Sequence, residues 1–434
     1  MAKRPSRAQE RQRLIEEAAA VRVPSECDVA VIGGGAAGLV AAITAAEAGA
    51  SVTVFEQDLT CGKPILATGN GRCNFANVNL DPKRFNDPSF VEAVCGDRWL
   101  DDVLAFFRES GMRWCLEDER LYPMSRSSAS VRNVLLARAR RAGVILAPGR
   151  EVAEVSFIEG SDYPAELCFV RRDEIDDTWL LPSARTVILA TGGEAFPFIG
   201  NLGLMTAPRT PVLCPVACED SPLSQLDGRR AQVRAYLTKQ GSFFPSWNER
   251  GEVLFRTYGL SGIVTFDLSR RAEKGDFVEL DLVPDLTKSQ VRQLVDGRGT
   301  GTFEPGCLDG ILDPLIANVL ETLARKRWHV EWPEREEAQT DADALVGLVK
   351  ALPFVVSGLT ETNHAQVTRG GLLTQQFDPA SLASLAHPWF FACGEALDID
   401  ADCGGFNLSW AWKSGMVAGE HAAHMAATLR SSHD

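Results

Sequence analysis

Residues 28–39 read Asp-Val-Ala-Val-Ile-Gly-Gly-Gly-Ala-Ala-Gly-Leu, and residues 51–56 read Ser-Val-Thr-Val-Phe-Glu. The apolar run before the glycines is typical of a parallel strand that is buried on both faces. Gly33, Gly35 and Gly38 follow with the spacing G-x-G-x-x-G, which predicts a tight turn into a helix. In this motif the first glycine permits the turn, the second admits a pyrophosphate to the backbone, and the third lets the helix pack closely on the strand.

An acidic residue stands at the end of the next predicted strand. The alanine-rich run over residues 36–48 predicts a helix, Gly49 ends it, and Glu56 closes the strand that follows. A carboxylate at this position can accept hydrogen bonds from ribose hydroxyls, and it repels the extra phosphate of NADP. Because the strand, the turn, the helix and the acid agree, we predict a bound dinucleotide rather than a structural glycine turn.

Composition favours a small-molecule ligand. A chain of 434 residues suggests two or three domains, and 45% hydrophobic residues are ordinary for a globular protein. The formal net charge of -14 argues against nucleic acid as the main partner. These numbers leave the oligomeric state open.

The cysteines indicate a reducing compartment. Their number, eleven, is odd, and no C-x-x-C pair occurs. With no secretory segment ahead of the fold, we expect reduced thiols and a cytoplasmic protein. No apolar run approaches the ~20 residues that span a bilayer, so no transmembrane segment is expected. Residues 1–24, rich in basic side chains, read as a solvated leader outside the fold.

A polar loop follows the second strand. Residues 61–77 contain too much glycine and asparagine for a helix or a central strand. Long polar loops inside compact domains are usually functional. Thr68, Asn70, Arg72 and Asn74 can bring donors to one small volume, which suits a polar ring or a phosphate.

This loop resembles that of the HI0933-like flavoproteins, a family that includes flavoproteins linked to bile-acid dehydroxylation and enzymes labelled aminoacetone oxidases. The family motif G-K-x-x-x-x-(T/S)-G-x-G-R-C-N-x-x-N is matched by residues 62–77, and the resemblance spans roughly residues 25 to 430. It implies FAD rather than NAD at the glycine-rich turn, with Lys63 and residues 70–74 around the pyrophosphate and the flavin. After Gly200 the family's S-T-G-D-G-Y segment is missing.

Three further stretches carry the resemblance. Residues 186–193 resemble the A-T-G motif at the end of a strand beside the cofactor, and Val152 matches a position that meets the adenine through its backbone. In residues 390–412 the resemblance implies that Glu395 holds a ribityl hydroxyl. It also implies that the helix after Gly405 stabilises the N1/O2 edge of a reduced flavin. The aspartates between them lack the rest of an EF-hand, so we predict no metal.

The motif and the resemblance together give the candidate cofactor-binding residues. They are Gly33, Gly35, Ala36, Ala37, Gly38, Glu56, Gln57, Lys63, Asn70, Gly71, Arg72, Cys73, Asn74, Val152, Thr191, Gly192, Gly394, Glu395, Gly405, Phe406 and Asn407. The sequence identifies no catalytic acid or base. Arg72 and Tyr258 are the candidates for polarising a substrate, and packing is an equal alternative for Tyr258.

The predicted fold class is α/β, with a discontinuous Rossmann-like FAD-binding domain interrupted by a β-rich, barrel-like domain that carries a helical insert. The predicted boundaries are 1–24 for the extension, 25–195 and 366–434 for the FAD-binding domain, 196–282 and 352–365 for the β-rich substrate domain, and 283–351 for the helical insert.

The predicted function is an FAD-dependent oxidoreductase that transfers hydride between the flavin and a small organic substrate. One dinucleotide fold is visible, so NADH or NADPH as electron donor would approach the flavin directly. Two alternatives stay open: an FAD-dependent amine oxidase or dehydrogenase, and a flavin-binding protein with a non-redox role in RNA modification or regulation. The acidic charge weighs against RNA.

Overall fold

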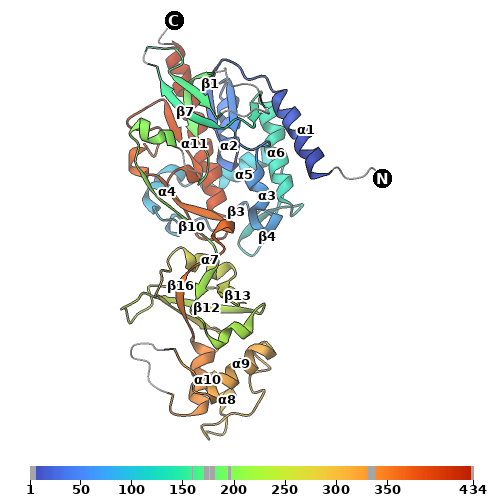
Figure 1. Cartoon of the computed structure of the whole chain (residues 1–434), viewed down its shortest axis with the longest axis vertical. Coiled ribbons are helices and arrows are strands. Elements are labelled where there is room, and N and C mark those ends of the chain that lie inside the picture. Colours follow the sequence, from blue (N-terminus) through green and yellow to red (C-terminus); the bar gives the residue numbers. More distant parts are fainter. Residues whose placement is uncertain are drawn as a thin grey trace. The chain divides into compact units, whose positions relative to one another are not determined.

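The computed structural model describes residues 6–158, 160–170, 175, 181–193, 197–330 and 338–431. The chain divides into two compact units (Figure 1). The first comprises Met1–Thr210 and Val367–Asp434, and the second comprises Pro211–Gln366. The division after Thr210 lies later in the chain than the boundary at residue 196 that the sequence suggested.

A mostly parallel sheet forms the centre of the first unit. Its order is β6-β2-β1-β9, β18 also pairs with β9, and an antiparallel hairpin of β8 and β7 extends the sheet from β9. The strands are β1 (Glu26–Ile32), β2 (Val52–Glu56), β6 (Ile145–Pro148), β7 (Val152–Phe157), β8 (Ala165–Phe169), β9 (Ser183–Leu189) and β18 (Phe390–Ala392). Val29, Ala30 and Val31 of β1 are fully buried, as the apolar run predicts.

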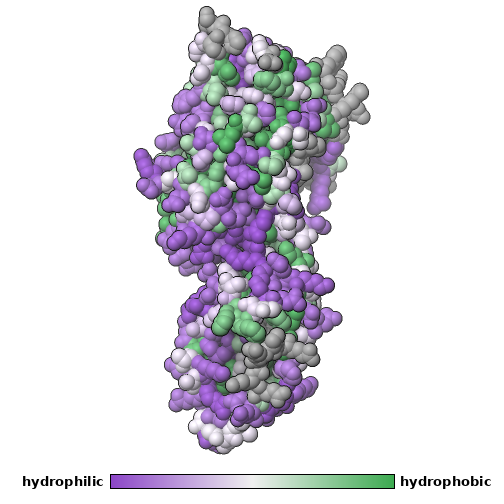
Figure 2. Space-filling model, turned by 90° about the vertical axis from the view of Figure 1, so that its left-hand side faces the viewer, coloured by the Kyte–Doolittle hydropathy of each residue, from purple (hydrophilic) through white to green (hydrophobic). Residues whose placement is uncertain are grey.

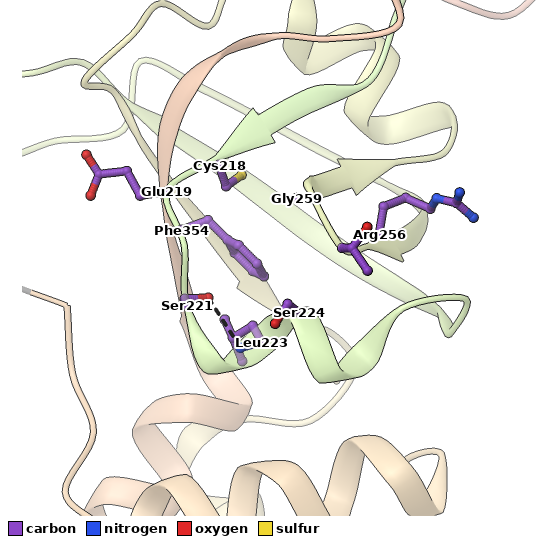
Figure 3. Close-up of a pocket in the computed structure, with 9 residues that line it drawn as sticks. Cys218, Glu219, Ser221, Leu223, Ser224, Arg256, Gly259 and Phe354 are labelled. Carbon is purple, nitrogen blue, oxygen red and sulfur yellow. Dashed lines mark hydrogen bonds between the residues drawn. The ribbon is translucent and has the colours of Figure 1, made fainter.

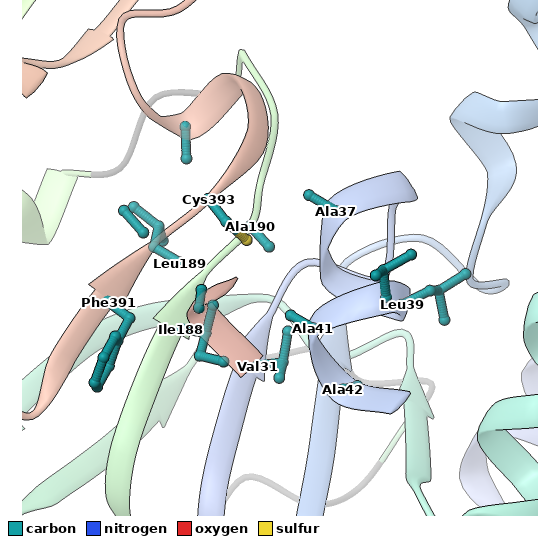
Figure 4. Close-up of a cluster of buried hydrophobic side chains, with 14 of the residues drawn as sticks. Val31, Ala37, Leu39, Ala41, Ala42, Ile188, Leu189, Ala190, Phe391 and Cys393 are labelled. Carbon is teal, nitrogen blue, oxygen red and sulfur yellow. The ribbon is translucent and has the colours of Figure 1, made fainter. Parts of the chain in front are cut away.

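Two helices pack on this sheet, and their backbones approach each other unusually closely. These are α2 (Ala36–Glu47) and α11 (Phe406–Ser431), which lie side by side in Figure 1. A Cβ atom on Gly415 would lie 2.6 Å from the carbonyl oxygen of Ala37, and one on Gly419 would lie 2.3 Å from that of Ala41. Figure 4 shows Ala37, Ala41 and Ala42 of α2 over Val31 and Ile188 of the sheet. Only glycine therefore permits this helix contact.

A buried charge cluster fixes the far end of α11 to β1. Asp28 is 3% exposed and accepts hydrogen bonds from Arg185 at 2.7 Å and from Arg430 at 2.6 Å. The backbone N–H and hydroxyl of Ser51 also donate to Asp28. Burial alone raises the pKa of Asp28, but the Ser51 and arginine hydrogen bonds outweigh it and lower the pKa to about 2.

The remaining helices and a small sheet complete the first unit. They are α1 (Arg7–Ala19), α3 (Lys63–Ala67), α4 (Pro88–Cys95), α5 (Trp99–Glu109), α6 (Ser128–Arg141), and an antiparallel sheet of β3 (Ala76–Asn77), β5 (Arg120–Pro123) and β4 (Trp114–Glu117). The expectation of a solvated leader was wrong for α1. Ile15 and Ala18 are buried, and the guanidinium of Arg150 donates to the carbonyl of Ala18 at 3.0 Å.

The second unit is a closed six-stranded barrel with helices against it, which confirms the predicted barrel and helical insert. The barrel order is β11 (Val216–Cys218), β14 (Gly259–Ser261), β13 (Trp247–Arg256), β12 (Arg230–Thr238), β15 (Phe277–Asp281) and β16 (Leu352–Leu359). The helices are α7 (Ile263–Ser269), α8 (Lys288–Val295), α9 (Pro314–Arg325) and α10 (Asp341–Lys350).

A separate two-stranded sheet joins β10 (Thr206–Val212) to β17 (Val367–Leu372).

Figure 2 shows hydrophilic and hydrophobic residues interspersed over one face. Among the described residues, no helix combines the length and the apolar character needed to cross a bilayer.

The helix contact predicts opposite effects for two equivalent substitutions. Gly419→Ala places a methyl group against the backbone of α2 and should lower the free energy of unfolding by about 1–3 kcal/mol. Gly347→Ala in α10 meets no atom within 4 Å and should raise it by up to about 1 kcal/mol, because alanine favours helix. Calorimetric unfolding of both variants measures the difference. A Gly419→Ala variant as stable as the wild type would contradict the close packing of α11 on α2.

The Asp28 cluster predicts a loss of stability in acid. The folded-state pKa of about 2 lies below the unfolded value of about 3.9, so the charged carboxylate stabilises the fold above about pH 4 by roughly 2–3 kcal/mol. This contribution disappears as the pH falls from about 4 to about 2. Urea unfolding of Asp28→Asn should show a deficit at pH 7 that shrinks toward pH 2. A deficit independent of pH would show that the charge does not stabilise the fold.

Candidate functional site

The glycines of the first turn fall into two structural groups. Gly33 has φ +103°, and a Cβ atom there would lie 2.5 Å from the carbonyl oxygen of Ala190. A Cβ atom on Gly38 would lie 1.9 Å from the carbonyl oxygen of Gly33. These two glycines are therefore required by the fold. A Cβ atom on Gly35 would meet nothing within 4 Å, so this glycine borders open space.

The N-terminus of α2 begins at this open space. Gly35 is the N-cap residue of α2 and supplies no side-chain hydrogen bond to the helix. The first N–H groups of a helix have no partner within it, and the positive end of the helix dipole attracts anions. Ala36 and Ala37 begin the helix, and the short segment at Gly394 adjoins it, because a Cβ atom on Gly394 would lie 2.7 Å from that of Ala37. This arrangement suits a pyrophosphate.

Glu56 stabilises the glycine turn and can still accept further hydrogen bonds. It is 8% exposed and accepts hydrogen bonds from the backbone N–H groups of Gly34 at 2.7 Å and Asp58 at 2.8 Å. Burial raises its pKa, and these two N–H groups oppose that rise. Each carboxylate oxygen has a second lone pair that a ribose hydroxyl can use. Gln57 is exposed, and Lys63 forms an ion pair with Asp58 at 2.8 Å near the surface.

Residues 61–77 contain a short helix, α3 (Lys63–Ala67), which their composition did not predict, and the polar loop that follows α3 is strained. Gly69, Asn70 and Cys73 have φ values of +54°, +53° and +56°, and the two non-glycine residues rarely adopt this conformation. Gly71 borders open space. The side-chain oxygen of Asn74, Oδ1, is buried and has no hydrogen-bond partner. Strain and an unsatisfied buried acceptor are typical of a ligand site.

Arg72 is already engaged within the protein. Its Nη2 lies 2.6 Å from Oε2 of Glu117, and its guanidinium carbon lies 4.5 Å from the ring centre of Tyr122. The sequence suggested Arg72 as a group that polarises a substrate. The structure shows that Glu117 takes up part of its hydrogen-bonding capacity.

The residues that follow β9 lie beside the glycine turn, because a Cβ atom on Gly33 would lie 3.0 Å from the Cα atom of Thr191. The hydroxyl oxygen of Thr191 is buried and has no hydrogen-bond partner. Gly192 has φ +64°, and a Cβ atom there would meet nothing within 4 Å. The side chain of Val152 is buried in β7, where it pairs with Phe169. Thr191 thus offers a second unused polar atom.

Glu395 is held by the backbone of β17. Its Oε1 accepts a hydrogen bond from the N–H of Thr368 at 2.6 Å. Burial raises the pKa of Glu395 to about 7, with Asp400 contributing in the same direction, while the hydrogen bond from Thr368 opposes the rise. A Cβ atom on Gly193 would lie 3.0 Å from this Oε1. Glu395 therefore lies beside Gly193, close to the end of β9.

The start of α11 adjoins the polar loop. A Cβ atom on Gly405 would lie 2.7 Å from the carbonyl of Ala76 and 2.9 Å from the unpartnered Oδ1 of Asn74. The side chain of Asn407 is used by the fold: it accepts from the N–H of Ala401 at 2.8 Å and donates to its carbonyl at 2.9 Å. Phe406 packs edge-on against Phe85. The side chains of Asn407 and Phe406 thus shape the loop before α11.

Trp410 and Ser414, which the motifs did not indicate as site residues, position Gly394. Nε1 of Trp410 donates to the carbonyl of Gly394 at 3.0 Å, and the N–H of Gly394 donates to the hydroxyl of Ser414 at 2.9 Å. Nε1 of Trp412 donates to the carbonyl of Phe75 at 2.9 Å. The signal was two tryptophans in the first turns of a predicted helix, since a buried indole needs an acceptor.

The acidic turn before α11 is neutralised by arginine. Nε and Nη2 of Arg369 donate to the two carboxylate oxygens of the fully buried Asp400 at 2.8 and 3.0 Å. Within the part of the chain that the structure describes, no group of three or more histidine, cysteine or acidic side chains could hold a metal ion.

Tyr258 belongs to the second unit, beside a small pocket. Glu361 and burial raise its pKa, and the guanidinium of Arg256 lies 5.7 Å from its ring. Figure 3 shows the pocket, with Phe354 at its centre. The charged ends of Glu219 and Arg256 point in opposite directions in this view, so they form no paired acid and base.

The residues of the first unit fit a dinucleotide. A Cβ atom on Gly35, Gly71 or Gly192 would meet no protein atom within 4 Å, and two buried polar atoms of the same segments, Oδ1 of Asn74 and Oγ1 of Thr191, have no partner. The N-terminus of α2 and the carboxylate of Glu56 lie at the same turn.

Comparison with known proteins gives similarity over nearly the whole chain. The model for the HI0933-like protein Rossmann domain matches residues 27–421. A 3-dehydro-bile acid delta(4,6)-reductase of Clostridium scindens is 32% identical over 423 residues, which cover 91% of this chain and 98% of that protein. A ribosomal RNA dihydrouridine synthase of Haemophilus influenzae is 24% identical, over 88% of this chain and 95% of that protein.

Solved structures show a more distant likeness. A 3-ketosteroid-delta4-(5alpha)-dehydrogenase from Rhodococcus jostii has a TM-score of 0.46 and 15% identity, over 94% of this chain and 98% of that one.

The two groups of glycines predict separable effects. Gly35→Ala should leave the melting temperature near the wild-type value, because φ is −79° and the methyl group meets no protein atom. It should lose FAD, because the methyl group occupies the space for the pyrophosphate. Gly38→Ala should be destabilised by the clash with Gly33. Visible absorbance gives the flavin content and thermal unfolding gives the stability. A Gly35→Ala variant that keeps its full flavin would contradict the site.

Proposed function

This chain belongs to the HI0933-like family and is an FAD-dependent oxidoreductase, and we propose that it reduces a carbon–carbon double bond conjugated to a carbonyl group. In the proposed reaction a hydride is added at the carbon distant from the carbonyl, and a proton is added at the carbon next to it. NADH or NADPH supplies the two electrons and becomes oxidised. The substrate is a small organic molecule.

The similarity to the bile-acid reductase carries this proposal. That relative is matched over nearly its full length, and its name describes reduction of double bonds in conjugation with a 3-oxo group. The name of the ribosomal RNA dihydrouridine synthase describes saturation of the uracil double bond, which is also conjugated to a carbonyl. Relatives that act on different molecules thus share one kind of reaction, which supports the reaction class more strongly than any single substrate.

The chain's own residues have distinct roles in this proposal. The N-terminus of α2 and Gly35 bind the pyrophosphate, and Glu56 accepts hydrogen bonds from the ribose of the adenosine. Bound FAD supplies the hydride-transfer chemistry. Glu395 accepts a hydrogen bond from the ribityl chain, and the backbone of Val152 meets the adenine.

We assign the polar loop and the start of α11 to the flavin end of the cofactor. Asn74 and Gly405 adjoin one another, and the unpartnered Oδ1 of Asn74 can accept a hydrogen bond there. The positive end of α11 favours negative charge on a ligand. Asn407 and Trp410 fix the backbone on either side, so these groups are oriented before the ligand binds.

Two further features bear on the substrate and the setting. The net charge of -14 disfavours an RNA substrate and leaves a small molecule as the leading candidate. All eleven cysteines are free, which supports a cytoplasmic location.

Anaerobic spectroscopy tests the proposal. We expect NADH or NADPH to bleach the flavin absorbance of the purified protein, and a 4-en-3-one steroid to restore it while being converted to the saturated ketone. A saturated 3-ketosteroid is the matched control and should leave the flavin bleached. Restoration by unmodified ribosomal RNA, and not by the enone, would replace the small-molecule substrate with RNA. Bleaching by amines instead of nicotinamide nucleotides would overturn the reductase assignment.

A further inference from the structure

Two arginines converge on one carboxylate beside the polar loop. Nη2 of Arg72 lies 2.6 Å from Oε2 of Glu117, and Nε of Arg126 lies 2.5 Å from Oε1 of the same carboxylate. The guanidinium of Arg72 stacks on Tyr122. We call Arg72, Glu117, Tyr122 and Arg126 the arginine cluster.

The small antiparallel sheet fixes the centre of this cluster. Cys115 of β4 lies opposite Tyr122 of β5, and Glu117 lies two residues after Cys115. Directly opposed residues and residues two apart point to the same face of a sheet. Glu117 and Tyr122 therefore share one face, and Arg72 reaches it from the polar loop.

The cluster is accessible to a ligand. The side chains of Arg72, Arg126 and Glu117 are 42%, 51% and 32% exposed. Arg126 adopts the left-handed conformation with φ +51°, which a non-glycine residue keeps only where the surroundings demand it.

Exposed apolar side chains come from the same segments. Leu66 lies in α3 and is 36% exposed, and its carbonyl accepts a hydrogen bond from Ser128, two residues after Arg126. Met124, two residues before Arg126, is 62% exposed. Charged and apolar surface together suit an amphipathic molecule with an acidic group.

We propose that Arg72 and Arg126 form an anion-binding site for the acidic group of a molecule that exchanges electrons with the flavin, and that Glu117 occupies this site until the molecule binds. The proposal rests on the reductase function inferred above. The acidic group is a carboxylate on the substrate or the 2′-phosphate of NADPH. Both present oxygens that the planar guanidinium groups can bind in pairs.

Glu117 is suited to occupy the anion-binding site while no ligand is bound. Hydrogen bonds from Arg72 and Arg126 hold the pKa of Glu117 below its usual range, so it is a carboxylate at neutral pH. An incoming anion can take Nη2 of Arg72 and Nε of Arg126 only by displacing Glu117. Arg72 adjoins Gly71 in the polar loop, which places this exchange next to the candidate flavin site.

Calorimetric titration of the FAD-loaded protein tests the site with two pairs of probes. The pairs are 2′,5′-ADP with 5′-AMP, and cholate with its methyl ester, and each pair differs in one anionic group. We expect Arg126→Ala to weaken binding of the charged probe of one pair by about tenfold, through loss of a charge-assisted hydrogen bond. Glu117→Gln should tighten it about threefold to tenfold, because the competing carboxylate is removed. The probes that lack this anionic group should respond to neither change.

Glu119→Gln is the matched control, since it removes an exposed carboxylate from the same hairpin and should leave binding unchanged. Arg126→Lys should restore part of the affinity that Arg126→Ala loses, because it keeps the charge. Flavin absorbance and melting temperature establish that each variant is folded and loaded.

The outcomes separate the source of the anion from the existence of the site. A response confined to 2′,5′-ADP identifies the nucleotide phosphate, and one confined to cholate identifies a substrate carboxylate. Equal affinities in the wild type, Arg126→Ala and Glu117→Gln would overturn the proposal and leave a structural ion pair. Because titration requires no turnover, this result is independent of whether enone reduction is found.

Discussion

The contact between α2 and α11 is the constraint on which the first unit depends. Gly415 and Gly419 bring α11 so close to α2 that any side chain at either position would meet the backbone of Ala37 or Ala41. The same approach allows Trp410 to bind the carbonyl of Gly394 and Ser414 to bind its N–H group. Gly394 in turn adjoins the first turn of α2. Three segments that would bind different parts of one cofactor are therefore positioned by a single packing interface, and a shift of α11 would be felt in all of them.

Four buried carboxylates of the first unit are matched in two different ways. Asp28 and Asp400 are buried, and each is matched by arginine. Glu56 and Glu395 are matched by backbone N–H groups instead, and burial raises the pKa of both. Neutral donors leave the negative charge of a carboxylate uncompensated, whereas an arginine neutralises it. This difference separates carboxylates that maintain the fold from those that can serve a ligand.

Sequence periodicity and motif spacing predicted the features that depend on local geometry. The buried strand, the glycine turn and the position of Glu56 follow from steric rules that act over a few residues. The barrel and helical insert were also predicted. The burial of α1 and the engagement of Arg72 by Glu117 were not, because they depend on side chains from distant segments meeting in the folded chain. For the same reason Asn407 matched a cofactor motif although its side chain serves the loop before α11.

The discontinuous first unit has a consequence for synthesis in the cell. The ribosome makes β1, α2 and the polar loop early, but β18 and α11 emerge only after the whole of the second unit. Domains fold largely as units while the chain is being made, at about 5–20 residues per second. The nascent first segment must therefore wait, with the alanine face of α2 uncovered, until its partner helix arrives. The flavin can therefore bind only after α11, which begins at Phe406, has been synthesised. A chain that ends inside the second unit would be released without flavin and would be open to proteolysis.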